Sequence, residues 1–146
     1  MLISDMEAEL KRADEQDRYT RFNKWCQEVG IRAPKLEYPA IFDGGLCGVR
    51  VTEDIAHNEA MFCVPYSVII TVERAQAEPE LKPVFLAHPQ LFDPEEHDDW
   101  EHYILMTFML FELQKGRKSF WYPYFEILPK DACAFWRWDP KVIKET

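Results

Sequence analysis

The spacing of apolar residues predicts a helix near the start of the chain. Apolar side chains recur there at steps of three and four residues, which is the spacing of one helical face; they are Tyr19, Phe22, Trp25, Cys26 and Val29. Gly30 follows this stripe directly, and glycine is the usual residue at the left-handed C-terminal cap of a helix. Residues 1–18 are rich in charge, and we expect them to form either a solvated helix or a frayed lead-in.

Short apolar runs follow a glycine-rich stretch in the middle of the chain. Val49 and Val51 alternate with polar residues, as in a half-buried strand. Residues 60–64 and 68–70 form two further apolar runs of strand length. After a proline-containing loop, we therefore expect a small curved antiparallel sheet over about residues 46–70.

Two further helices are predicted from their capping residues. Thr71 is suited to cap a short helix that runs to Ala75. The stretch Asp93-Pro94-Glu95-Glu96 places proline after a capping residue and glutamate three residues after the cap. We expect this second helix to run from Pro94 to Lys115, with Gly116 as its stop.

The predicted long helix has more apolar surface than the rest of the chain is able to cover. It is apolar almost all round between Tyr103 and Leu113, and a soluble protein buries such a helix on most sides. We expect an α+β fold in which the N-terminal helix and the long buried helix flank the small sheet. Few other large elements remain to cover the long helix, which indicates that part of the fold is missing.

Composition narrows the classes of function. The chain has 146 residues and a net charge of −9, whereas duplex nucleic-acid binders are normally basic. We therefore expect a protein partner and no direct nucleic-acid partner. There is no N-terminal signal segment and no apolar run of about 18 residues, so we expect an intracellular, soluble protein, most simply a cytoplasmic one. Without a CxxC pattern, the cysteines are interpreted as free buried thiols of a reducing compartment; they are Cys26, Cys47, Cys63 and Cys133.

No metal site or hydrolytic centre is expected from the residue pattern. Two pairs of residues four apart would each share a helical face: His97 with Glu101, and Asp98 with His102. Their acidic surroundings are typical of a solvated first helical turn, which favours surface charge over metal ligation. The serines have no evident base partner in the sequence.

Aromatic residues are concentrated near the end of the chain. Tyr122 and Tyr124 lie in the stretch SFWYPYFEILP, and we interpret them as packing residues rather than as parts of a reaction channel. Phe135, Trp136 and Trp138 follow in the tail. They either close a local core or form an exposed apolar patch for a partner.

Several segments, taken in order, resemble SET-domain protein methyltransferases. The similar branch includes the Rubisco large-subunit methyltransferase and the actin-histidine methyltransferase. No single segment is specific, and the resemblance rests on their order and spacing; they are residues 22–30, GVRVTEDI at 48–55, 58–59, 64–65, 71–75 and 120–129. The resemblance implies that residues 19–146 are the N-terminal portion of a SET domain, preceded by a charged helical lead-in over residues 1–18, with the catalytic C-terminal half absent.

The same resemblance implies a cofactor-binding site at the glycine-rich stretch. In this family the loop passes beside S-adenosylmethionine, and glycine lets main-chain groups approach a ligand closely. The implied cofactor-binding residues are Gly45, Leu46, Cys47 and Gly48. The usual family loop reads Glu-Gly-x-Gly, so Gly48 matches whereas Gly45 and Leu46 depart. No catalytic residue is assigned, because the Asn-His motif and active-site tyrosine of the family's second half are not found.

Two hypotheses for function follow. In the first, the chain is the cofactor-side half of an S-adenosylmethionine-dependent methyltransferase that acts on a lysine or histidine of another protein, and it is inactive alone. In the alternative, it is a non-catalytic, SET-derived structural or interaction subunit of a larger, multi-subunit protein assembly. The departure of the glycine loop favours the alternative, whereas the matches around residues 120–129 favour the first.

Overall fold

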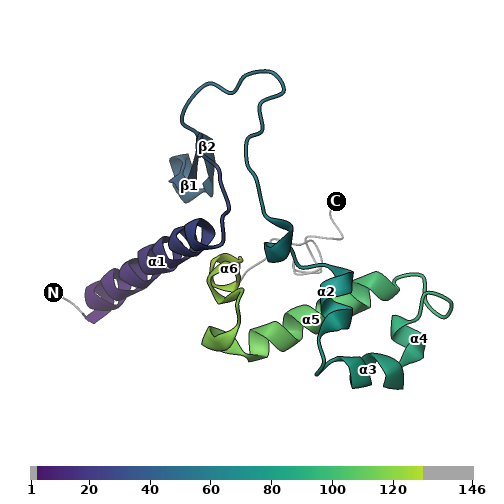
Figure 1. Cartoon of the computed structure of the whole chain (residues 1–146). Helices are drawn as coiled ribbons and strands as arrows, with labels where there is room; N and C mark the ends of the chain where they lie inside the picture. The colour runs from purple at the N-terminus through teal and green to yellow at the C-terminus, as the bar shows by residue number, and fades with distance from the viewer. Residues whose placement is uncertain (1–2, 130–146) are drawn as a thin grey trace, which may run out of the picture.

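The computed structural model describes residues 3–129, and the side chains of residues 16–129. In the view of Figure 1, α1 lies on the left below the hairpin, α6 lies in the middle, and α2 to α5 lie on the right, while the hairpin and a long loop project upward. The aromatic tail with Phe135, Trp136 and Trp138 lies outside the described residues, as does Cys133. The predictions made for these positions remain predictions.

The N-terminal helix α1 (Ile3–Glu28) includes the predicted apolar stripe. Gly30 has a φ of +82° and its N–H donates to Gln27 O at 3.2 Å, while the Ile31 N–H donates to Cys26 O at 2.8 Å. This pair of bonds is the Schellman arrangement, so the predicted glycine cap is confirmed. The helix continues through residue 18 without interruption, and a division of the chain at that point remains a prediction.

The described residues form one antiparallel sheet of two strands, β1 (Leu36–Ile41) and β2 (Cys47–Val51). Leu36 lies opposite Val51 and Ile41 opposite Cys47, with an irregularity between Glu37 and Ala40. The prediction of a loop before residue 46 was therefore wrong over β1. Pro39 lies within that irregularity, which is where a strand tolerates a residue that has no N–H to donate.

The strands predicted at 60–64 and 68–70 are not formed. Cys63 makes one isolated antiparallel bridge with Arg32, with N–H to O distances of 3.0 and 2.8 Å. Residues 66–68 form the short 3-10 helix η2 (Tyr66–Val68) instead. An extended segment needs a neighbouring strand to complete its ladder, and among residues 3–129 none lies beside these two runs.

Helix α2 (Val72–Ala77) starts as predicted, because Thr71 Oγ1 accepts a hydrogen bond from the Arg74 N–H at 3.2 Å. Helices α3 (Lys82–Ala87) and α4 (Pro89–Phe92) follow. The long helix α5 spans Trp100–Gln114 and is followed by η3 (Gly116–Lys118) and α6 (Tyr122–Ile127).

The predicted start of the long helix at Pro94 was wrong. Asp93 forms a turn instead: its Oδ1 accepts from the Glu95 N–H at 2.9 Å, and its main-chain O accepts from the His97 N–H at 3.0 Å. A capping side chain satisfies the same N–H groups in an isolated turn as in a helix. The stop was predicted correctly, since Gly116 follows α5 with a φ of +53°.

The core lies between α2, α5 and α6 rather than under the hairpin. Its buried members are Ala75, Leu81, Ile104, Phe108 and Trp121. The Trp121 Nε1–H donates to Val68 O at 2.8 Å, which ties η2 to this core. The mixture of helices with a small antiparallel sheet confirms the expected α+β class and fits a partial domain.

One face of α5 is not covered by the described residues. Met106, Leu110 and Leu113 are 57%, 59% and 47% exposed, at the i, i+4 and i+7 spacing of a single helical stripe. The opposite face buries Ile104 and Phe108. The predicted excess of apolar helix surface is therefore confirmed.

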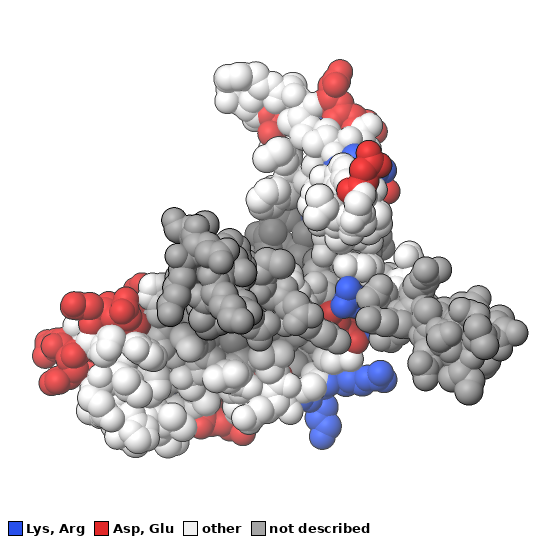
Figure 2. Space-filling view, turned by 180° about the vertical axis from the view of Figure 1, so that it is seen from behind, with Lys and Arg blue, Asp and Glu red and all other residues white. Residues whose placement is uncertain are grey.

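The surface differs from the prediction at two cysteines. Cys47 and Cys63 are exposed and only Cys26 is half-buried, and all three are free thiols. The interpretation of buried thiols was wrong at the first two, because β2 and residue 63 lie at the surface. Acidic side chains occur both at the end away from the hairpin and on the projecting part (Figure 2). Over the described residues, no helix is both long and apolar enough to cross a bilayer.

Candidate functional site

The predicted cofactor residues lie together at the end of the hairpin. Gly45 closes the turn η1 (Asp43–Gly45), and Gly48 lies in β2. Gly44 and Gly45 have φ values of +78° and +79°, a region that residues with a Cβ rarely adopt. The turn is closed by the Phe42 N–H, which donates to Leu46 O at 2.8 Å.

The space around these glycines shows that they have two different roles, one in packing and one in the conformation of the turn. A Cβ added at Gly44 or Gly45 would meet no atom within 4 Å, whereas one at Gly48 would lie 3.2 Å from the Phe42 ring. Gly48 is therefore needed for packing of that ring, which also lies 5.4 Å below the Arg50 guanidinium. The glycines of the turn are needed for its conformation, and they leave its main chain exposed.

Cys47 connects the hairpin to α1. Its Sγ donates to Tyr19 Oη at 3.6 Å, and the Tyr19 ring packs edge-on against Tyr38 of β1 with centroids 5.6 Å apart. Burial raises the pKa of Tyr38 to about 12 and also raises the pKa of Tyr19. Tyr19 belongs to the helical stripe predicted from the sequence, whereas its contact with Tyr38 was not predicted, since β1 was not predicted.

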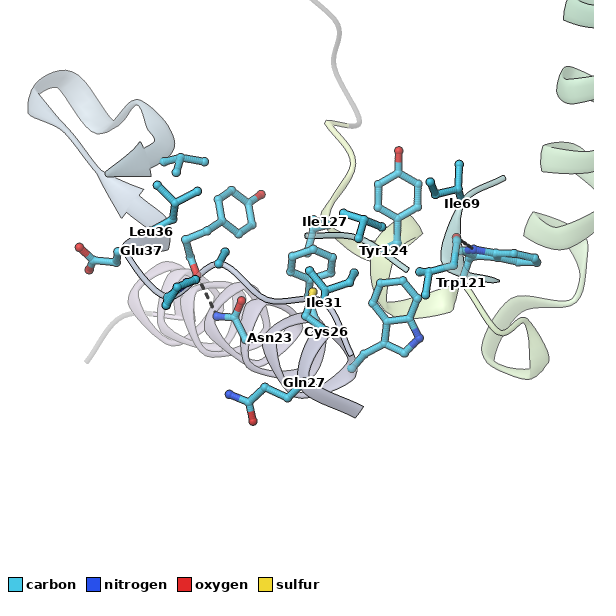
Figure 3. A pocket seen from close by; sticks show the side chains of 18 of the residues that line it. Asn23, Cys26, Gln27, Ile31, Leu36, Glu37, Ile69, Trp121, Tyr124 and Ile127 are labelled. Atoms are coloured by element: carbon cyan, nitrogen blue, oxygen red, sulfur yellow. Dashed lines mark hydrogen bonds between the residues drawn. The ribbon is translucent and has the colours of Figure 1, made fainter. Parts of the chain in front are cut away.

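An apolar cavity of about 1040 Å³ lies beside the hairpin. Side chains of α1, of residues 31–38, of residues 64–70 and of α6 face it (Figure 3). Apolar residues dominate its walls, among them Trp25, Cys26, Ile31, Leu36, Ile69 and Ile127. Burial raises the pKa of the Cys26 thiol to about 11. Sequence patterns did not predict this cavity, because its walls come from segments far apart in the chain.

The cavity and the predicted cofactor residues are neighbours but not one site. Val49 of β2 lines the cavity, whereas Gly45, Leu46, Cys47 and Gly48 do not. Inside the cavity region, Asn23 Nδ2 donates to Tyr38 O at 2.8 Å (Figure 3). The hairpin therefore presents one surface to the cavity and its turn to solvent.

The predicted packing role in the SFWYPYFEILP stretch is confirmed for Tyr124, whereas Tyr122 makes a hydrogen bond. Tyr124 packs against the core, and Tyr122 Oη donates to Glu126 Oε1 at 2.6 Å. Glu126 in turn accepts two hydrogen bonds from Arg21 of α1, at 2.8 and 2.9 Å. This network, which we call the Arg21–Glu126 bridge, joins two walls of the cavity.

The histidine and carboxylate pairs do not form a metal site in the described part of the chain. No group of three or more ligating side chains lies together among residues 16–129. His97 precedes α5 rather than lying on it, so it does not share a helical face with Glu101. Its ring packs edge-on against Tyr103 at 4.8 Å, and its Nδ1 accepts from the Asp99 N–H at 3.0 Å.

Two curated protein methyltransferases and a protein with a SET-domain name are similar to this chain. The chain is 27% identical to the N-lysine methyltransferase setd6 of Xenopus laevis over 122 residues, which cover 80% of the chain and 25% of that protein. It is 28% identical to the actin-histidine N-methyltransferase of Drosophila melanogaster over 119 residues, covering 80% of the chain and 20% of that protein. It is 26% identical to Protein SET DOMAIN GROUP 40 of Arabidopsis thaliana over 124 residues, covering 75% of the chain and 24% of that protein.

No family model and no solved structure matches the chain. The chain spans a quarter or less of the length of these curated relatives, with 25%, 24% and 20% covered. The similarity extends over most of the chain, and the small α+β fold with its uncovered surfaces agrees with it. The chain thus resembles the SET-domain protein methyltransferases and fits a partial SET domain.

Proposed function

We propose that this chain forms the cofactor-side part of an S-adenosylmethionine-dependent protein methyltransferase and is not catalytic alone. Its similarity to an N-lysine methyltransferase and an actin-histidine N-methyltransferase supports this proposal. The proposed acceptor is therefore a lysine or histidine side chain of another protein. Because the chain spans at most 25% of those relatives, the remaining machinery would come from residues outside this sequence.

The observation that carries the proposal is the open glycine turn. Gly45 leaves space on the side where a Cβ would stand, and Leu46 and Cys47 are exposed beside it. These residues fit one side of a bound nucleoside-type cofactor, which main-chain groups would hold. When bound, S-adenosylmethionine supplies a sulfonium methyl group for transfer.

The open turn also supports inactivity of the chain alone. Methyl transfer requires the acceptor nitrogen to be neutral and aligned with the methyl carbon, in surroundings that disfavour its protonated form. Such alignment needs walls on both sides of the reacting atoms. The turn provides one side, since nothing lies within 4 Å of a Cβ placed at Gly44 or Gly45.

A backbone-amide titration tests the cofactor assignment. We expect S-adenosylhomocysteine, added to the ¹⁵N-labelled chain, to shift the amide signals of Gly45, Leu46, Cys47 and Gly48 most, with a Kd on the order of 1 mM for a one-sided site. The Gly116 amide is an internal control, because this glycine also has a positive φ and open surroundings. If only the amides of other residues shift, or if no amide shifts at a ligand concentration ten times the expected Kd of about 1 mM, the turn does not bind the cofactor.

A pair of matched variants separates cofactor contact from turn conformation. Gly44→Ala and Gly45→Ala introduce the same methyl group at nearly equal φ values of +78° and +79°, both in open space. Each is expected to destabilise the turn by about 1–2 kcal/mol. Only Gly45→Ala is expected to weaken binding further, and equal weakening by both would show that the turn conformation alone matters.

The exposed apolar face of α5 favours a second candidate function. Met106, Leu110 and Leu113 form a stripe that the described residues leave uncovered, and such surfaces often mark partner sites. The chain would then be a SET-derived structural subunit of a larger assembly. Native mass spectrometry on the chain isolated from its own source distinguishes the two. A stoichiometric cofactor mass supports the methyltransferase proposal, and a cofactor-free assembly with unrelated proteins supports the subunit role.

A further inference from the structure

The exposed stripe of α5 has the spacing of a seam between paired helices. Tyr103, Met106, Leu110 and Leu113 follow one another at steps of three, four and three residues, the alternation found at the contact positions of paired helices. Tyr103 is half-buried, and the other three are 57%, 59% and 47% exposed. Exposed apolar side chains that adjoin one another in this way form a patch, which is typical of a docking surface.

The stripe is complementary to itself when a second copy of α5 runs in the opposite direction. With a twofold axis at the level of position 108, positions 106 and 110 are equidistant from the axis, as are positions 103 and 113. Met106 of one copy therefore meets Leu110 of the other, and Tyr103 meets Leu113. Each contact occurs twice, as in any twofold interface. In a parallel pair, each residue would face its own equivalent.

The charges at the two ends of α5 favour the antiparallel direction. Asp98 and Asp99 precede the helix, and Arg117 and Lys118 follow it. All four side chains are exposed, and the one ion-pairing partner that any of them has among the described residues is His102, 3.9 Å from Asp99. An antiparallel pair brings the acidic end of each helix near the basic end of the other. A parallel pair would bring like charges together, which is unfavourable.

The seam is short, so we expect the association to be weak. From Tyr103 to Leu113 it spans about 15 Å of helix, whereas each partner in a stable complex buries about 800 Å². Interfaces below that size are typical of transient complexes. A Kd on the order of 10–100 μM is therefore expected.

We propose that this chain forms a twofold homodimer through the exposed stripe of α5, with antiparallel helices and with Met106 of each copy against Leu110 of the other. The proposal rests on neither function proposed above, because it needs no cofactor and no unrelated protein. It assigns a second copy of the chain to the surface that the described residues leave uncovered.

Sedimentation velocity on the full chain, without cofactor, tests the dimer. The chain has a mass of 17.4 kDa, and we expect the average mass to rise toward twice this value between about 1 and 300 μM. Leu110→Glu is expected to weaken association at least about 30-fold, because it places a charge in an apolar contact. The matched control is Leu86→Glu on α3, where the leucine is 74% exposed. It is expected to leave the Kd within about twofold of the parent.

A reciprocal pair of variants tests the direction and register of the helices. Met106→Lys and Leu110→Glu are each expected to stay monomeric at about 100 μM, whereas their mixture is expected to form a heterodimer. Antiparallel pairing sets the introduced ammonium group against the introduced carboxylate and leaves the second contact, Leu110 with Met106, apolar. A parallel pair would not bring the two new charges into one contact. Circular dichroism establishes that each variant keeps the helix content of the parent.

Three results would each overturn the proposal. The first is a parent chain that stays monomeric up to about 300 μM, which would leave the stripe to a different partner. The second is equal association of Leu110→Glu and Leu86→Glu, which would place the interface elsewhere. The third is a mixture of folded Met106→Lys and Leu110→Glu chains that forms no heterodimer.

Discussion

The Arg21–Glu126 bridge is expected to be a main source of cohesion between α1 and α6. The Glu126 carboxylate accepts from Arg21 Nε and Nη2 at 2.8 and 2.9 Å and from Tyr122 Oη at 2.6 Å. The side chains of Glu126 and Arg21 are 17% and 32% exposed, so the pair is partly shielded from water. Replacing Glu126 with glutamine keeps the size of the side chain and removes its charge.

We expect Glu126→Gln to lower the free energy of unfolding at pH 7 by about 2 kcal/mol. A hydrogen bond to a charged group contributes about 1.5–3 kcal/mol, and the amide retains one acceptor while presenting donors toward Arg21. For a domain of this size the change corresponds to a fall in Tm of about 8 °C. Urea unfolding followed by far-UV circular dichroism measures this change, since most of the described regular secondary structure is helical.

The matched control is Glu28→Gln, which removes a carboxylate from α1, the helix that carries Arg21. Glu28 lies 3.8 Å from Lys24, with side chains 60% and 76% exposed, and such surface pairs contribute little. We expect a change of at most about 0.5 kcal/mol. If Glu126→Gln and Glu28→Gln have equal effects, the bridge does not hold the two helices together.

The pH dependence of the free energy of unfolding provides a second test of the bridge. Burial alone would raise the pKa of Glu126, but the hydrogen bonds from Arg21 and Tyr122 outweigh burial and hold it below its ordinary value of 4.5. The stabilisation is therefore fully present above pH 4.5 and is lost as pH falls through the folded-state pKa. The difference between parent and Glu126→Gln is expected to shrink below that pH, and a constant difference would contradict this account.

Three further predictions concern side chains that are buried or half-buried. Ser119→Ala is expected to lower the free energy of unfolding by about 2–3 kcal/mol, because Ser119 Oγ donates to buried Glu112 at 2.6 Å and accepts from the Trp121 N–H at 3.1 Å. Urea unfolding measures this loss, and a loss below about 0.5 kcal/mol would contradict the prediction. Thr71→Ala is expected to lower the free energy of unfolding by about 1 kcal/mol and Thr71→Ser by much less, because Thr71 Oγ1 caps α2. If thermal unfolding shows equal losses of stability for the two variants, the hydroxyl group does not act as a cap. The pKa of Cys26 is raised by burial from 9.0 to about 11, so its contribution to stability is present below pH 9 and lost as pH rises toward 11. Cys26→Ala is expected to flatten that part of the stability profile, and an unchanged profile would argue against it.

Local sequence signals predicted the elements that depend on local contacts. The apolar stripe of α1 and its glycine cap at Gly30 were correct, because a helix and its Schellman cap are built from neighbours in sequence. The Thr71 cap was correct for the same reason. The start of α5 was placed too early, because Asp93 satisfies N–H groups in a turn as readily as at a helix terminus.

Elements that depend on distant partners were less predictable. Residues 60–64 have the apolar pattern of a strand, but Cys63 makes only one bridge, with Arg32. Strand β1 was missed, because Pro39 argues against a strand unless its irregular pairing is known. The glycine turn was located correctly in the sequence, whereas the cavity beside it depends on α6 and residues 64–70, which are distant in the chain.

The seating of Tyr38 on α1 has a mechanical consequence for the glycine turn. The hairpin is held to α1 through the Tyr38 ring and the bond from Asn23 to Tyr38 O, and Cys47 Sγ donates to Tyr19 Oη of α1 nearer the turn. Three strand positions separate Tyr38 from Ile41, the last residue of β1, which is a lever of about 10 Å. A rotation of about 10° at Tyr38 would displace this end of the strand by about 1.7 Å, about three times the tolerance of about 0.5 Å that a preorganised binding group requires. Any element that braces the hairpin from its far side would therefore act on ligand affinity through the angle of this lever, without touching the ligand itself.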